Sequence, residues 1–340
     1  DSGALDEITL RRNRSAFEEI LMSPRMLRDV TSREMGTTIL GAEVEAPILV
    51  APMAFQRLAH DEGEAATATA AAREGTGMVL STLSTTSGAQ VARSFGGEPL
   101  WFQLYVHKDR GLTRELVSKA EEEGFKALCV TVDAPLLGRR ERDEANAFSL
   151  PSNMRLEVLG SLSSRQVSSE GAGSGLFGYF LEQIDASLTW KDLEWLAGIT
   201  RLPVVPKGIL HPEDARVAAE SGAPAIVISN HGGRQLDTAV STIEALPSIR
   251  EAVANFSVEL YLDGGIRRGT DILKSLALGA QGILVGRPIL WGLAVDGSEG
   301  ARTVLQILKD ELDLAMALTG CRTLAEIDES IIFGKGHQRP

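Results

Sequence analysis

The sequence is poor in cysteine, in aromatic residues and in long apolar runs. Only Cys129 and Cys321 occur among 340 residues, and Cys129 lies inside the apolar run at residues 127–132. We therefore expect reduced thiols and an intracellular protein, because oxidising compartments favour disulfides. No apolar run approaches the ~20 residues that cross a bilayer, and the first residues do not resemble a signal peptide. We expect a soluble protein with no membrane partner.

Basic residues are also in deficit. Asp and Glu number 46 against 34 Lys and Arg, which gives a net charge of -12 and a pI near 5.0. This balance argues against a nucleic-acid partner, because binding to phosphate backbones relies on clustered Lys and Arg. Residues 335–340 do not contain the peroxisomal signal Ser-Lys-Leu. Its absence weakens a peroxisomal assignment and leaves the cytoplasm and the peroxisome both open.

Several motifs of common enzymes are missing. The sequence has no Walker phosphate loop, no serine nucleophile elbow and no zinc motif. We expect no metal site, because four of the five histidines have no metal-ligand spacing and little prospect of a catalytic role. These four are His60, His107, His211 and His337.

Eight short apolar segments alternate with longer amphipathic ones, which is the pattern of repeated βα units. Eight such units close more naturally into a barrel than into an open sheet, so we predict one (β/α)8 TIM barrel domain over residues 1–340. A doubly wound sheet is the alternative, but the early Gly-x-Gly-x-x-Gly that it favours is absent. The predicted strands are residues 48–51, 78–81, 101–106, 127–133, 203–207, 225–230, 260–264 and 282–286.

One connection breaks this rhythm. Residues 150–178 are rich in Ser and Gly and are long for a βα connection. Because they follow the fourth strand, they belong at the mouth of the barrel. We expect a mobile lid that excludes water from the active site, and a plain surface insertion is the alternative.

The most specific segment is Ser-Asn-His-Gly-Gly-Arg-Gln-Leu-Asp at residues 229–237, at the end of the sixth strand. His231 is suited to act as a base near neutral pH. Arg234 is suited to bind a carboxylate through two parallel hydrogen bonds. Taken singly, these side chains fit a turn cap and a surface ion pair, but together they indicate a site for a 2-hydroxy acid.

Polar residues also end the other strands. Asp133 can orient the imidazole, and Arg139 or Arg140 can contact an anionic substrate, although an aspartate here also fits a helix cap. The polar atoms of Gln103 and Tyr105 need hydrogen-bond partners inside a barrel, which either a bound ligand or an internal hydrogen bond within the core supplies. Lys207 needs a negative group, which an anionic flavin supplies, or it serves as a Schiff base. Backbone amides and arginines at residues 263–269 and 286–288 favour a phosphate.

The ordered set of motifs resembles the FMN-dependent L-2-hydroxy acid oxidases and dehydrogenases, which include glycolate oxidase, lactate oxidase and mandelate dehydrogenase. The motifs are Ala-Pro-Met-Ala at 51–54, Gln-Leu-Tyr at 103–105, Thr-Val-Asp-Ala-Pro at 131–135, Val-Pro-Lys-Gly at 205–208, the segment 229–237, Leu-Asp-Gly-Gly-Ile-Arg-Arg-Gly at 262–269 and Val-Gly-Arg-Pro at 285–288. The resemblance covers nearly the whole chain and implies a homo-oligomer, namely a tetramer.

The resemblance also implies the role of each residue. His231 is the base and Asp133 its partner, Arg234 and Arg140 bind the substrate carboxylate, and Tyr105 contacts the substrate oxygen. Among the flavin contacts, Lys207 stabilises negative charge on the ring. The full set of FMN contacts comprises Ala54, Ser81, Gln103, Thr131, Lys207, Ser229, Asp263, Gly265, Arg267, Gly286 and Arg287.

Three departures from the family pattern bear on the substrate. The family usually has a further amino-terminal segment whose tyrosine helps to bind the carboxylate, and this sequence starts just after that segment. Leu83 stands where glycolate oxidases carry a tryptophan, so this substrate-binding position favours lactate or longer 2-hydroxy acids. Met53 replaces a threonine, which leaves the flavin contact there to backbone groups.

The resemblance therefore implies oxidation of a 2-hydroxy acid to a 2-oxo acid, with O2 reduced to H2O2. Hydride transfer and a carbanion route both need the same base, so the sequence does not choose between them. One rival is a dehydrogenase of the same family that passes electrons to a quinone or a cytochrome. The other is a catalytically idle flavin-binding protein.

Overall fold

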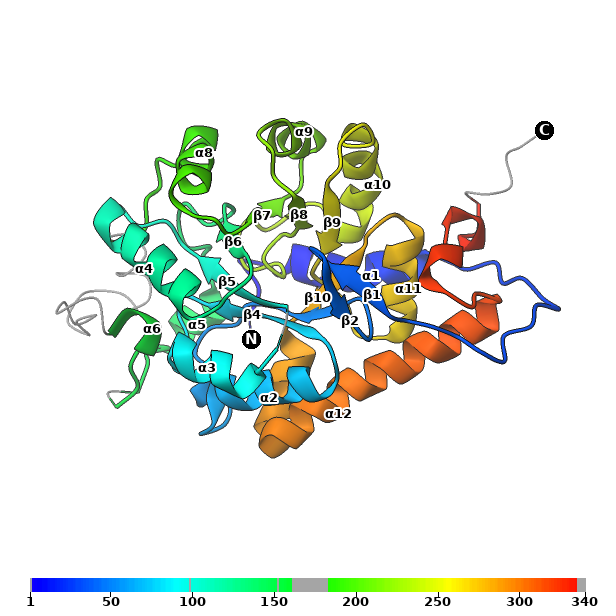
Figure 1. Cartoon of the computed structure of the whole chain (residues 1–340), viewed down its shortest axis with the longest axis horizontal. Coiled ribbons are helices and arrows are strands. Elements are labelled where there is room, and N and C mark those ends of the chain that lie inside the picture. Colours follow the sequence, from blue (N-terminus) through cyan, green and yellow to red (C-terminus); the bar gives the residue numbers. More distant parts are fainter. Residues whose placement is uncertain (1, 98, 152, 161–182, 335–340) are drawn as a thin grey trace.

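Eight parallel strands close into a barrel in the computed structural model, which describes residues 2–97, 99–151, 153–160 and 183–334 (Figure 1). The strand order around the barrel is β10-β3-β4-β5-β6-β7-β8-β9, so consecutive strands are neighbours and the last pairs with the first. The strands are β3 (Ile48–Val50), β4 (Gly77–Ser81), β5 (Leu100–Leu104), β6 (Leu128–Thr131), β7 (Val204–Ile209), β8 (Ala225–Ile228), β9 (Glu259–Leu262) and β10 (Gly282–Val285).

Helices surround the barrel and follow its strands. The final helix, α12 (Arg287–Thr319), packs against α2 (Gly63–Arg73) and α11 (Gly269–Ala277) and bends at Asp296 and Gly297 (Figure 1). No helix within the described residues is both long and apolar enough to span a membrane. The other helices are α1 (Ile8–Glu19), α3 (Gly88–Phe95), α4 (Arg110–Glu122), α5 (Glu141–Ala145), α6 (Glu157–Gly160), α8 (Trp190–Ile199), α9 (Pro212–Glu220) and α10 (Thr242–Ala252).

The predicted (β/α)8 barrel is thus confirmed, with strand ends that differ by at most two residues from the predicted ones. Of the eight barrel strands, only β7 continues past its predicted end, from Lys207 to Ile209. Asp133 and His231 lie in the loops just after their strands. Most of the segment 150–178, where a lid is expected, lies outside the described residues.

The barrel interior has two layers, because alternate residues of a strand face the same side. The lower layer is mostly apolar. The residues that lie two positions further along each strand form the upper layer, which is mostly polar. The lower layer is Leu49, Val79, Trp101, Cys129, Val205, Val227, Tyr261 and Leu284. The corresponding upper positions are Ala51, Ser81, Gln103, Thr131, Lys207, Ser229, Asp263 and Gly286.

A hairpin covers the lower end of the barrel. Strands β1 (Thr37–Ile39) and β2 (Ala42–Val44) pair in antiparallel fashion, and their Ile39 and Val44 side chains join the lower interior cluster. The backbone N–H of Leu40 donates to Glu259 over 3.2 Å. With its lower end filled by side chains, the barrel is open to ligands at the carboxyl ends of its strands.

Candidate active site

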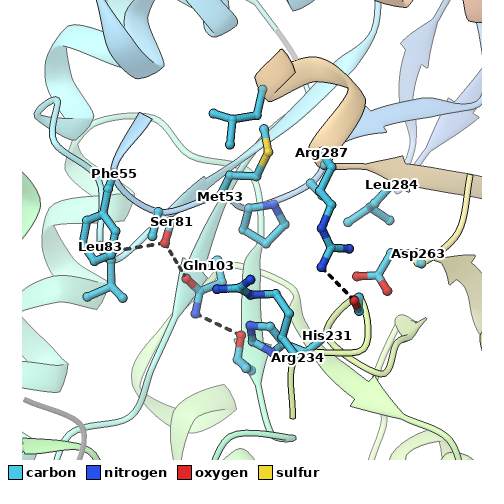
Figure 2. A pocket seen from close by; sticks show the side chains of 18 of the residues that line it. Met53, Phe55, Ser81, Leu83, Gln103, His231, Arg234, Asp263, Leu284 and Arg287 are labelled. Atoms are coloured by element: carbon cyan, nitrogen blue, oxygen red, sulfur yellow. Dashed lines mark hydrogen bonds between the residues drawn. The ribbon is translucent and has the colours of Figure 1, made fainter. Parts of the chain in front are cut away.

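A cavity of about 460 Å³ lies at the carboxyl ends of the strands, and Figure 2 shows the side chains that converge on it. Its volume is in the range of small-molecule sites. Fifteen of the predicted site residues line it, while Asp133 and Ser229 contact lining residues from behind. The fifteen are Ala54, Ser81, Leu83, Gln103, Tyr105, Thr131, Arg140, Lys207, His231, Arg234, Asp263, Gly265, Arg267, Gly286 and Arg287.

His231 and Asp133 form a hydrogen-bonded pair from two different strand ends. His231 Nδ1 lies 2.9 Å from Asp133 Oδ1, and the backbone N–H of His231 donates to Ser229 Oγ over 3.0 Å. Burial raises the pKa of Asp133, but the charge and hydrogen bond of His231, together with Lys207, outweigh this effect and lower it. Asp133 therefore stays an anion that orients the imidazole and leaves Nε2 for the cavity.

The backbone at His231 is held in an uncommon conformation. Its φ is +56°, in the left-handed region that side chains other than glycine rarely adopt. Gly232 and Gly233 follow with φ of +65° and +74°. This tight turn places the imidazole at the rim of the cavity, and such strained residues cluster at functional sites.

Lys207 is buried with a carboxylate beside it. Its Nζ lies 3.1 Å from Asp263 Oδ2 and donates to Ser229 Oγ over 2.9 Å. Burial lowers the pKa of Lys207, but Asp263 and Asp133 outweigh burial and raise it above its ordinary value. The amine is therefore protonated at neutral pH, which argues against a Schiff-base role, because a nucleophilic lysine must be neutral.

Four arginines line the cavity in two pairs. Arg140 and Arg234 come from the loops after β6 and β8, and Arg267 and Arg287 follow β9 and β10, with Arg287 as the first residue of α12. Burial is the main cause that lowers the pKa of all four. Mutual repulsion adds to burial, as Arg140 and Arg287 lower the pKa of Arg234.

Backbone carbonyls, which carry no net charge, accept hydrogen bonds from three of these arginines. Arg234 donates to Ser2 over 2.5 Å, Arg287 to Gly232 over 3.0 Å (Figure 2) and Arg267 to Ile266 over 2.7 Å. The buried Nε of Arg140 has no hydrogen-bond partner among the described residues. Concentrated, incompletely neutralised positive charge of this kind is suited to bind anions.

A chain of hydrogen bonds crosses the floor of the cavity. Ser81 Oγ donates to Gln103 Oε1 over 3.2 Å, and Gln103 Nε2 donates to Thr131 Oγ1 over 2.9 Å (Figure 2). Chiefly through burial, the pKa of Tyr105 is raised to about 12, so its phenol keeps its proton at neutral pH. Gln103 and Tyr105 thus lie at the cavity wall, as the sequence predicts.

The residues present fit FMN. Asp263 Oδ1 is buried without a hydrogen-bond partner within the described part of the chain, and a ribityl hydroxyl can donate to it. Helix α12 begins at Arg287, directly after Gly286, so its amino-terminal N–H groups and two arginines converge where a phosphate is expected. Gly265 has φ of +86°, and a Cβ there would lie 2.0 Å from the Asn13 carbonyl oxygen, so close packing against α1 requires glycine at this position.

Sequence reasoning missed several residues of the cavity wall. Phe55, Leu137, Phe148 and Leu290 line it, as does Asp143 of α5. Phe55, Leu137 and Phe148 lie outside the helices and strands, where apolar residues leave no periodic signal, so the sequence alone does not single them out. Among the described residues, no group of three His, Cys, Asp or Glu side chains is placed to hold a metal ion.

The chain is similar to known flavin enzymes along nearly all of its length. Residues 1–333 match the model of the family described as FMN-dependent dehydrogenase. An L-lactate oxidase from Nostoc sp. is 56% identical over 334 residues, which cover 97% of this chain and 91% of the relative. Glycolate oxidase from Spinacia oleracea is 50% identical over 331 residues, or 97% and 89% of the two chains.

Solved structures agree with this assignment. A crystal structure of mandelate oxidase with (S)-4-hydroxymandelic acid superimposes with a TM-score of 0.90 at 40% sequence identity, covering 97% of this chain and 91% of that one. The sequence matches and the fold thus indicate the same family. The chain belongs to the FMN-dependent dehydrogenase family and is an FMN-dependent oxidoreductase.

Proposed function

We propose that this protein is an FMN-dependent L-2-hydroxy acid oxidase that prefers lactate and longer acids to glycolate. The observation that carries the proposal is the His231–Asp133 pair, which shares one cavity with the buried Arg140 and the partly buried Arg234. A base beside a carboxylate-binding pair matches a substrate whose hydroxyl is adjacent to its carboxylate.

Each residue has a defined task in the reaction. Arg234 and Arg140 bind the carboxylate, the phenol of Tyr105 donates to the substrate oxygen, and His231 accepts a proton at Nε2 while Asp133 stabilises the imidazolium. FMN, when bound, accepts the two electrons and passes them to O2. The substrate thus loses two electrons and two protons to become the 2-oxo acid, and O2 gains them as H2O2.

The remaining predicted residues would hold the cofactor. Lys207 would place a positive charge by the ring, and Ser81, Gln103, Thr131 and Ala54 line the same cavity, with Ser229 hydrogen-bonded to Lys207. Asp263 would accept from the ribityl chain, and Gly265, Arg267, Gly286 and Arg287 would bind the phosphate. The unpartnered Asp263 oxygen and the start of α12 support this arrangement.

The cavity wall around Leu83, where the substrate side chain would lie, is apolar. Leu83 and Phe55 both line the cavity, and Figure 2 shows them side by side. A leucine occupies less volume than the tryptophan of glycolate oxidases, so a methyl or longer substituent at C2 gains apolar contacts here. The 56% identity to an L-lactate oxidase supports the same preference.

Anaerobic mixing with a series of acids tests the function. We expect lactate and longer 2-hydroxy acids to bleach the bound flavin faster than glycolate, and readmitted air to restore the colour with release of peroxide. Reoxidation by a quinone but not by air would instead identify the dehydrogenase, and a flavin that no 2-hydroxy acid bleaches would identify the idle flavoprotein.

Assembly and location are separate proposals. We propose a homotetramer, supported by the family resemblance and by exposed apolar side chains on two adjoining segments, residues 21–27 and 314–333. Backbone hydrogen bonds from Arg25 to Thr319 and from Phe333 to Leu21 join these segments. Sedimentation equilibrium measures the mass of the assembly. Their exposed side chains are Leu21, Met26, Leu27, Leu314, Leu318 and Phe333. We also propose an intracellular location, since both cysteines are buried free thiols.

A further inference from the structure

Asp143 places a carboxylate in the wall of the cavity, next to the arginines that face His231. It lies on the short helix α5, three residues after Arg140, and lines the cavity. One of its oxygens, Oδ2, is 4.0 Å from Arg234 Nη2. The proposed reaction gives this carboxylate no task, although it sits where the substrate brings a carboxylate of its own.

Ser2 fixes Asp143 in relation to Arg234. The Ser2 hydroxyl donates to Asp143 Oδ1 over 2.8 Å, while the Ser2 carbonyl accepts from Arg234 Nη1 over 2.5 Å. The Ser2 side chain is nearly fully buried, at 3% exposed. Asp143 is thus held beside the guanidinium at ion-pair range, with one oxygen occupied by the hydroxyl.

Asp143 is the main source of negative charge beside Arg140 and Arg234. It is the largest of the charges that raise the pKa of Arg140 and of Arg234, against the burial that lowers both. The other carboxylates of α5 face elsewhere: Glu144 forms an ion pair with Arg139 over 3.1 Å, and Glu141 lies 4.0 Å from Arg139. Asp143 therefore partly neutralises both arginines.

We propose that Asp143 is a positioning residue that acts as a resident counter-ion for Arg140 and Arg234 and limits the affinity of the site for carboxylates. It holds the two guanidinium groups in place before substrate arrives, and it repels the incoming carboxylate once that group is bound. The inference rests on the proposed function, since it takes the same two arginines as the carboxylate site. Its consequence is weaker binding of substrate and of the 2-oxo acid product, which must leave.

The test measures the binding of two inert anions to the FMN-loaded enzyme, with the visible spectrum of the flavin as the readout. Oxamate carries one negative charge and oxalate two, and neither has a C–H bond at C2 to oxidise. In Asp143→Asn we expect the Kd of oxamate to fall by about 3–10-fold, and that of oxalate by about the square of this factor. The matched control Glu144→Gln removes the same charge from the same helix and should leave both Kd values within about twofold.

The charge dependence separates electrostatics from a change of shape. A purely structural role for Asp143 would change the Kd of oxamate and the Kd of oxalate by the same factor, or would weaken the binding of both anions. Either result overturns the inference. Thermal midpoint and flavin content report folding, and Asp143→Ser replaces Asp143→Asn if the latter does not fold. Unchanged anion binding in Asp143→Asn, with a wild type that binds oxalate, overturns this inference alone. A wild type that binds neither oxalate nor oxamate overturns the proposed carboxylate site with it.

Discussion

The two layers of the barrel interior come from the same strands and differ in almost every chemical property. In the lower layer, Trp101 and Tyr261 pack edge to face with ring centroids 5.5 Å apart, and Ile39 of the hairpin joins them. Two residues further along each strand, the upper layer presents Lys207 beside Asp263. A step of two residues thus separates the part that stabilises the barrel from the part that binds ligands.

This division has a physical basis. Buried charges are unfavourable unless they are paired or wait for a charged ligand. The upper layer concentrates them because FMN and the substrate both bring negative charge, whereas the lower layer is filled by its own side chains and the hairpin, and its Tyr261 hydroxyl donates to Glu259. Substitutions above should therefore change activity at little expense in stability, and substitutions below should do the reverse.

The largest effect is expected for His231→Gln in the upper part. Turnover with the best 2-hydroxy acid should fall by about 10²–10⁴-fold, because glutamine cannot accept the proton. Flavin content and thermal midpoint should stay close to those of the wild type. Steady-state kinetics under air measures the loss, and His211→Gln, at the amino-terminal cap of α9, is the control. A yellow, folded variant with parental turnover would remove His231 from the mechanism.

A substitution in the hairpin that packs against the lower layer should do the opposite. Ile39 is fully buried, so Ile39→Ala should lower the free energy of unfolding by about 2–5 kcal/mol. Turnover per bound flavin should not change. Denaturant unfolding and kinetics on the same sample measure both, with Ile307→Ala as control, because Ile307 is 45% exposed. A loss of turnover per flavin at Ile39 would show that the two layers are not independent.

Much of this arrangement could be predicted from the sequence. Eight apolar segments in alternation with helices predict the barrel, because burial on both faces produces near-continuous apolar strands. The placement of His231, Asp133 and Lys207 at one end then follows, since the carboxyl ends of all eight strands meet there. Strand ends differ by a few residues, because hydrogen bonding between neighbours decides where pairing stops.

Contacts between distant loops could not be predicted. The hydroxyl of Ser2 contacts Asp143, 141 residues away in the sequence, and its carbonyl contacts Arg234, 232 residues away. No local sequence pattern encodes contacts between residues so far apart. The choice between Arg139 and Arg140 is a similar case. Arg140 is buried in the cavity wall, while Arg139 is exposed and pairs with Glu144. Only the direction of the backbone at the start of α5 separates these neighbours.

Within the upper part, the two pairs of arginines should separate binding of substrate from binding of cofactor. Arg234→Lys should raise the KM for the acid by about 10–100-fold with little change in FMN affinity, because lysine cannot make two parallel hydrogen bonds. Arg267→Lys should weaken FMN binding by about 10-fold and leave the KM of the flavin-loaded enzyme unchanged. Each variant is the control for the other. Equal effects of both on KM and FMN affinity would contradict the division into two anion sites.

The smallest effect concerns the ionisation of Tyr105 at the cavity wall. Burial raises the pKa of Tyr105 to about 12, above the ~10 of an unfolded chain. A raised pKa means that the stabilisation is fully present below pH ~10 and is lost as the pH rises through the folded value. Between pH 9 and pH 11 the wild type should therefore lose about 1 kcal/mol more stability than Tyr105→Phe. Urea unfolding across this range measures the difference, and parallel curves for the two proteins would mean that the phenol is not desolvated.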